Sequence, residues 1–101
     1  MPMLHIVNKS PTQTSALASC LRLAQDGHAL LLTEDAVYAA TAAGATASGI
    51  AAATQRLKVY ALQPDVAARG MSGRLIEAVA LVDYAGFVDL VAEHRNNQSW
   101  L

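Results

Sequence analysis

Cys20, the only cysteine of the chain, is the side chain best suited to covalent chemistry. A cysteine attacks or carries sulfur as its thiolate, and a helix N-terminus or a cationic neighbour lowers the thiol pKa from about 8.5. Cys20 instead falls well inside a predicted helix, in an apolar stripe with Leu17, Leu21 and Ala24. Local physics favours a packing role, since a free cysteine behaves as a small hydrophobe. A reactive role requires that the edge of this stripe faces a cleft or a partner.

A second candidate site lies where the first strand gives way to the first helix, at residues 8–11. Ser10 suits a helix N-cap, Pro11 suits the first helical position, and Gln13 falls where a capping-box partner belongs. The free backbone N–H groups of such a helix start can bind an anion, with help from Lys9. No glycine-rich loop is present, so ordinary capping is the favoured interpretation.

Other chemistry has little support in the sequence. His5, His28 and His94 lack metal-ligand spacing, and a lone strand histidine such as His5 is more often packed and hydrogen-bonded than a ligand. Glu34 and Asp35 are adjacent, so their carboxylates diverge and do not form an acid/base pair. No nucleophile elbow, phosphate loop or dinucleotide-binding pattern appears. We therefore expect no metal and no cofactor, and a domain that works together with other proteins.

Apolar runs alternate with helical patterns along the chain. Residues 29–32 are uniformly aliphatic, which is typical of a strand covered on both faces. The other predicted strands are 4–7, 57–62 and 78–82. The longer predicted helices are 11–25, 63–69 and 84–94, the last of them capped by Asp83. Between the second and third strands we expect a short helix capped by Asp35 and further helical pieces within 36–55, interrupted by Gly44 and Gly49. This alternation predicts a single three-layer α/β domain over residues 1–101, with a mostly parallel sheet of four to five strands, flavodoxin-like in outline. The pattern leaves the strand order open.

Composition indicates an oligomeric protein. Hydrophobic residues make up 53% of the 101 positions and charged residues only 15%, which is more apolar material than one small core needs. The formal net charge of -1 gives no support to direct nucleic-acid binding, and a single cysteine rules out an internal disulfide. No secretory signal is visible at the start, and the uncharged stretch 36–55 has too few large apolar side chains for a membrane span. We expect a cytoplasmic protein that contacts no membrane.

Several short segments, in order and at matching spacing over nearly the whole chain, resemble the TusB/DsrH sulfur-relay family. They are LHIVNKSP at 4–11, LLLTED at 30–35 with VYAA at 37–40, VYAL at 59–62, ARG at 68–70, VDY at 82–84 with FV at 87–88, and the closing Trp100. The resemblance implies a small accessory subunit of a cytoplasmic sulfurtransferase complex. Its partners would be a TusC/DsrF-like and a TusD/DsrE-like chain, in a heterohexamer with two copies of each.

The same resemblance implies that the complex accepts persulfide sulfur and hands it to a downstream acceptor protein. In the Tus branch the sulfur ends in 2-thiouridine at the tRNA wobble position, which is the leading expectation here. The alternatives are a DsrH-type role in dissimilatory sulfur oxidation and a stand-alone anion-binding domain at Lys9 and Ser10, beside Glu34.

Site residues follow from the resemblance in the same way. The main sulfur-carrying cysteine is expected on the D/E partner. Dsr-branch proteins also carry a cysteine in the first helix, where Cys20 falls, so Cys20 is a candidate persulfide carrier. We expect Tyr38, Trp100 and Leu101 at a subunit interface, because a tryptophan next to a chain end docks either on its own domain or on a partner.

Overall fold

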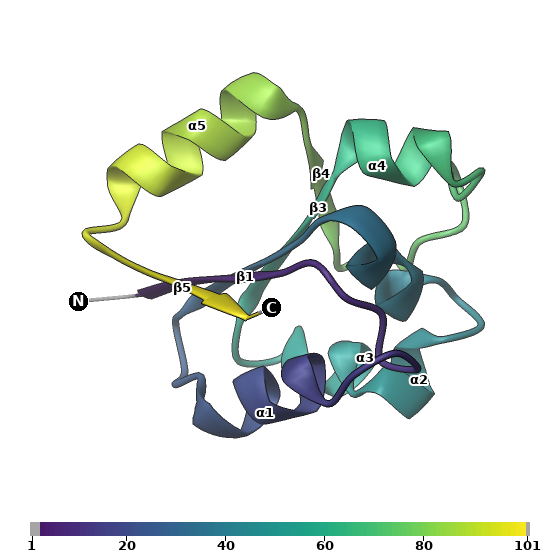
Figure 1. Cartoon of the computed structure of the whole chain (residues 1–101), viewed down its shortest axis with the longest axis horizontal. Helices are drawn as coiled ribbons and strands as arrows, with labels where there is room; N and C mark the ends of the chain where they lie inside the picture. Colours follow the sequence, from purple (N-terminus) through teal and green to yellow (C-terminus); the bar gives the residue numbers. More distant parts are fainter. Residues whose placement is uncertain (1–2, 101) are drawn as a thin grey trace.

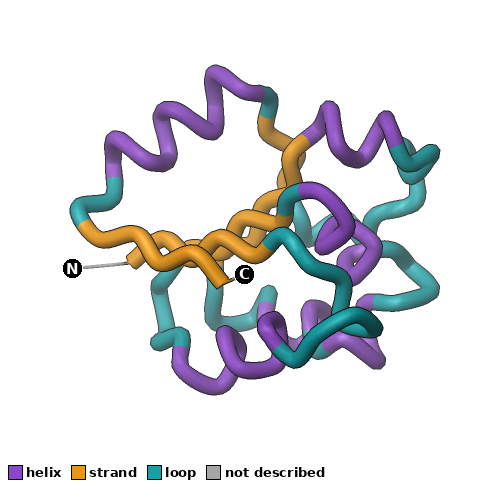
Figure 2. Tube along the Cα trace, in the orientation of Figure 1, coloured by secondary structure: helices purple, strands orange, loops and turns teal. Residues whose placement is uncertain are grey.

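The computed structural model describes residues 3–100, and its centre is a five-stranded sheet. All four strand pairings are parallel, in the spatial order β4-β3-β2-β1-β5. The strands are β1 (Met3–Val7), β2 (Ala29–Leu32), β3 (Lys58–Leu62), β4 (Ala80–Val82) and β5 (Asn96–Trp100). Figure 2 shows these strands in orange, with helical segments on both sides. The predicted α/β fold with a mostly parallel sheet is confirmed.

Helices cover the two faces of the sheet unequally. The helices are α1 (Ala16–Leu23), the 3-10 helix η1 (Glu34–Ala40), α2 (Ala45–Ser48), α3 (Ile50–Ala53), α4 (Gln63–Ala68) and α5 (Tyr84–Glu93). In Figure 1, α5 lies on one side of the sheet, while α1, α2 and α3 lie on the opposite side. The strand order explains this division. The chain steps in one direction from β1 to β4 and then returns past β1 to β5, and right-handed crossovers place the helix of the return step on the other face.

The central strand β2 contributes to two separate cores because alternate residues of a strand point to opposite faces. Leu30 and Leu32 belong to the larger core, which contains Leu17 and Cys20 of α1. Ala29 and Leu31 belong to a smaller core closed by α5, with Leu90 as its buried helix residue. Every residue of β2 is buried, as the uniform apolar run predicted.

The first helix begins later than the sequence predicted. We expected Ser10 to cap a helix starting at Pro11, whereas α1 begins at Ala16. The Ser10 N–H does donate to Gln13 Oε1 at 3.0 Å, as in a capping box, but this contact closes a turn that precedes the helix. The local signal was correct about the hydrogen bond and wrong about the element that follows it.

The last segment is a strand, whereas the sequence predicted no further strand or helix after residues 84–94. β5 pairs in parallel with β1, from Met3↔Asn96 to Val7↔Trp100. Its sequence NNQSW has neither the apolar alternation nor the β-branched residues of a typical strand. An edge strand with exposed side chains is held by backbone hydrogen bonds to its neighbour, so tertiary pairing overrides the weak local preference.

Two other local predictions, the cap of α5 and the interruption at Gly49, agree with the structure. Asp83 Oδ1 accepts a hydrogen bond from the Gly86 N–H at 2.8 Å and caps α5, as expected. Gly49 separates α2 from α3 with a φ of 89°, a conformation that glycine adopts without a steric penalty. Within residues 3–100, no helix is long and apolar enough to cross a membrane.

Candidate functional site

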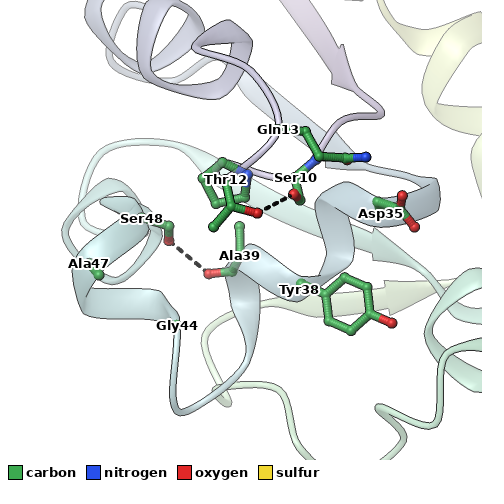
Figure 3. A pocket seen from close by; sticks show the side chains of 10 residues that line it. Ser10, Thr12, Gln13, Asp35, Tyr38, Ala39, Gly44, Ala47 and Ser48 are labelled. Atoms are coloured by element: carbon green, nitrogen blue, oxygen red, sulfur yellow. Dashed lines mark hydrogen bonds between the residues drawn. The ribbon is translucent and has the colours of Figure 1, made fainter.

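A hollow lies at the carboxyl ends of β1 and β2, the side of the sheet at which open α/β sheets usually bind ligands. Its volume is about 690 Å³. Three segments line it: the turn after β1, the helix η1, and Gly44 with the helix α2 that follows it (Figure 3). The lining residues are Ser10, Pro11, Thr12, Gln13, Asp35, Tyr38, Ala39, Gly44, Ala47 and Ser48. We call this hollow the crevice.

Hydroxyl groups in the crevice bond to the protein itself. Ser10 Oγ and Thr12 Oγ1 lie 2.9 Å apart, and Ser48 Oγ donates to the Ala39 carbonyl at 2.8 Å (Figure 3). The Ser10 N–H is occupied by Gln13. None of the described side chains that line the crevice is cationic, and Lys9 does not line it. This arrangement gives no support to an anion site at the turn after β1.

Backbone strain and an ion-pair network mark the carboxyl end of β2. Glu34 has a φ of 48°, in the left-handed region that non-glycine residues rarely adopt. Its N–H donates to Asp65 Oδ2 at 2.7 Å, which ties the strained turn to α4. Arg69 Nε donates to Asp35 Oδ1 at 2.8 Å, and Arg69 Nη1 lies 3.7 Å from Asp65 Oδ1. The hydrogen bond to Asp35 raises the pKa of the Arg69 guanidinium above its ordinary value.

Asp35 does not have the role that we predicted for it. The expected capping residue lies inside η1, and Thr33 occupies the N-cap position without a side-chain cap bond. Asp35 accepts from Arg69 of the following βα unit instead. The helix predicted here is present, but it is a seven-residue 3-10 helix, which is longer than such helices usually run.

Tyr38 stands between the crevice and a neighbouring hollow of about 460 Å³. Its side chain is 40% exposed. The second hollow is lined by Thr41, Met71 and Arg74, with Tyr38 and Gly44 shared between the two cavities. Tyr38 is therefore a large, accessible side chain where two concave surfaces meet, a position compatible with its predicted place at an interface.

Cys20 is fully buried, with 0% of its surface exposed, in the larger core beside Leu17 and Ala24. Burial raises the pKa of its thiol to about 12, and the charge of Arg56 offsets this only in part. Arg22, two residues further along the chain, is exposed, and its Nη2 lies 3.3 Å from Ser19 Oγ. The nearby cation comes from a residue 36 positions away, which no local pattern could reveal.

His5 is packed and hydrogen-bonded, as predicted. Its Nε2 lies 3.0 Å from His28 Nδ1, and its Nδ1 accepts from Trp100 Nε1 at 3.1 Å. Trp100 is half-buried against the larger core of its own domain, and Leu101 lies outside the described residues. Within residues 3–100, no group of three or more His, Cys, Asp or Glu side chains is placed to hold a metal ion.

Comparisons with known proteins identify the family. Residues 9–97 match the family model described as DsrH like protein. The TusB proteins of Escherichia coli K12 and of Escherichia coli O81 are each 38% identical to this chain over 98 residues, which cover 97% of this chain and 100% of theirs.

The solved structure of the Escherichia coli ychN protein covers 98% of this chain, and 99% of its own chain is matched. Its TM-score is 0.77 at 19% sequence identity, so it supports the fold alone. The family match and the full-length relatives lead to one conclusion: the chain belongs to the DsrH family.

Proposed function

We propose that this chain is an accessory subunit of a cytoplasmic sulfur-relay complex. The observation that carries the proposal is the match to TusB over nearly the entire length of both chains. The relay works by thiol exchange: an acceptor thiolate takes the outer sulfur of a donor persulfide, and the donor leaves as a thiolate, so the transfer needs no external oxidant or reductant.

The environment of Cys20 supports an accessory role in this transfer. With a thiol pKa of about 12, only about one molecule in 10⁵ carries the thiolate at pH 7. The sulfur atom is also inaccessible in the isolated chain. We therefore assign the main sulfur-carrying cysteine to a partner of the TusD/DsrE type, with Cys20 as a packing residue of this subunit. Cys20 can carry persulfide only if assembly opens the core around it.

The partners that we propose are one TusC/DsrF-like and one TusD/DsrE-like chain, in a heterohexamer with two copies of each subunit. Tyr38, Trp100 and Leu101 are the proposed interface residues, and the exposure of Tyr38 beside two hollows supports its inclusion. The pathway that we favour is 2-thiolation of the tRNA wobble uridine, because the full-length relatives are TusB proteins. A DsrH-type role in dissimilatory sulfur oxidation is the alternative.

Co-expression with the two related chains tests the proposal. We expect the three chains to copurify, with a mass in light scattering that corresponds to two copies of each. A chain that elutes alone after co-expression with both partners would contradict the proposal. Genes for two similar small proteins beside this gene are the expected source of those partners, and neighbouring genes of tRNA modification or sulfur oxidation would separate the two pathways.

Loading the assembled complex with a persulfide donor tests the assignment of the cysteine. Each subunit is weighed by mass spectrometry after brief incubation. We expect a gain of one sulfur atom on the TusD/DsrE-like chain and none on this chain. An added sulfur on Cys20 would show that the complex opens the core, and Cys20 would then be a carrier.

A further inference from the structure

Three aromatic side chains from distant parts of the chain form one hydrogen-bonded row. Trp100 Nε1 lies 3.1 Å from His5 Nδ1, and His5 Nε2 lies 3.0 Å from His28 Nδ1. The two imidazoles are stacked with 5.2 Å between their centroids, and the indole is tilted against His5 at 6.1 Å. The row connects the edge strand β5 to β1 and to the residue before β2.

The donors in this row define where the protons lie. An indole N–H only donates, so His5 Nδ1 must accept from Trp100. The proton of a neutral His5 is then on Nε2, which donates to His28 Nδ1. The backbone N–H of Gln25 also donates to His28 Nδ1, at 3.3 Å. The two donors therefore share the single lone pair of His28 Nδ1.

A second proton on His5 disrupts the row. It would place an N–H on Nδ1, directly facing the N–H of Trp100, and it would bury a positive charge beside His28. We propose that the row is a proton-sensitive latch, which holds the C-terminal strand β5 on the sheet while His5 is neutral and releases it when His5 is protonated.

β5 is the strand that such a latch can control. It lies at the edge of the sheet and pairs with β1 alone. The side chains of residues 96–99 are exposed, so Trp100 is the only described residue of β5 packed against the core. Little besides the backbone ladder and the Trp100 contacts holds the strand in place, and such edge elements open at low free-energy cost.

The direction of the pH effect follows from the environment of His5. The pKa of His5 is lowered below its ordinary value of 6.5, mainly by burial and to a lesser extent by the charge of the neighbouring His28. The docked state therefore binds fewer protons than the released state. Docking of β5 is at full strength above about pH 6.5 and weakens as the pH falls below that value, by up to about tenfold per pH unit.

Other ionisable groups near the row leave this direction unchanged. The strand β5 contributes none. Cys20, Arg22 and Asp26 lie on α1 and the loop after it, Arg56 and Lys58 lie before and at the start of β3, and His94 and Arg95 precede β5. The Cys20 thiol is neutral in this pH range, and Arg56 is paired with Asp26 at 3.7 Å. His94 Nδ1 donates to the Leu90 carbonyl at 2.7 Å and does not contact the row.

The test follows the single tryptophan of the full chain between pH 7.5 and pH 5.0. We expect a red shift of Trp100 emission with a midpoint below pH 6.5. Amide hydrogen exchange, corrected for its intrinsic pH dependence, should show loss of protection in β5 while β2 and β3 stay protected. An unchanged spectrum would overturn the proposal, and so would simultaneous loss of protection in all strands, because that is global unfolding.

Two variants make the test specific. His5→Asn keeps an acceptor, Oδ1, at the place of Nδ1 but does not titrate, so Trp100 should stay docked down to pH 5.0. His94→Gln removes another half-buried histidine near β5, and the transition should remain. A transition that survives His5→Asn, or that disappears in His94→Gln, would overturn the latch.

If His5→Asn does not fold, a measurement on the unaltered chain still tests the proposal. The nitrogen chemical shifts of the imidazoles report which ring atom carries the proton. At pH 7.5, we expect His5 to be neutral with its proton on Nε2. A proton on Nδ1, or a cationic His5 at that pH, would overturn the proposal without any variant.

Discussion

Burial of the Cys20 thiol makes the stability of the protein depend on pH. Its pKa is raised to about 12, because the thiolate cannot be solvated in the core. The unfolded chain therefore loses the thiol proton at a lower pH than the folded chain does. The stability contributed by the neutral buried thiol is complete below pH 9 and is lost as the pH rises toward 12.

We predict that the free energy of unfolding falls with rising pH more steeply in the native chain than in Cys20→Ala. Above pH 9 the difference in slope should approach about 1.4 kcal/mol per pH unit, the value for one proton. Urea unfolding at pH 8.0, 9.0 and 10.0 measures it. The alanine variant controls for the tyrosines and lysines that titrate in the same range. Parallel stability curves for the two chains would show that the thiol titrates normally.

Arg69 joins two elements beside the crevice, at the carboxyl ends of the strands. Its Nε bonds to Asp35 of η1, and its Nη1 reaches both Asp65 Oδ1 and, at 3.4 Å, the Asp65 carbonyl in α4. A lysine has one ammonium and cannot maintain these separate contacts.

We predict that Arg69→Lys lowers the free energy of unfolding by about 0.5–1.5 kcal/mol, a modest effect because the network is partly solvated. Chemical denaturation measures the loss. Arg74→Lys is the matched control, since Arg74 is exposed and forms no ion pair with any other residue of 3–100. Equal effects of the two substitutions would mean that the network contributes nothing to stability.

The helix α5 depends on its N-cap. The Asp83 carboxylate satisfies the Gly86 N–H at 2.8 Å, one of the donors that a helix start leaves unpaired. We predict that Asp83→Ala costs about 1 kcal/mol, whereas Asp83→Asn, which keeps a capping oxygen, costs much less. Asp89→Ala, in the exposed middle of α5, should change stability by less than about 0.5 kcal/mol. Thermal unfolding compares the three variants, and a cost for Asp83→Asn as large as that for Asp83→Ala would rule out capping.

Elements with strong local signals could be predicted from the sequence, and those held by distant contacts could not. The aliphatic run at residues 29–32 and the cap at Asp83 encode β2 and α5 locally. The sequence of β5 does not encode a strand, because its pairing with β1 joins positions about 93 residues apart. Distant contacts also explain the wrong prediction for Asp35. Its local sequence is that of a helix cap, whereas its actual partner, Arg69, is 34 residues away.

Across the whole molecule, the excess of apolar residues noted in the sequence is only partly used by the two cores. Among residues 3–100, the large hydrophobic side chains that remain exposed are Leu23, Tyr38, Leu81, Tyr84, Val88 and Val91. Three of them lie on α5, and Tyr38 lies between the crevice and the second hollow. The two exposed tyrosines, Tyr38 and Tyr84, thus lie on two separate surfaces of the subunit.

These two tyrosines allow a matched test of the proposed interface. We predict that Tyr38→Ala weakens assembly with the two partner chains at least about tenfold in Kd, as expected for an aromatic residue at the centre of an interface. Tyr84→Ala removes a side chain that is 60% exposed in this subunit and should leave assembly unchanged. Analytical ultracentrifugation of the copurified subunits measures both, after thermal unfolding has shown that each variant is folded. The reverse outcome, weakening by Tyr84→Ala alone, would move the interface from the crevice to α5.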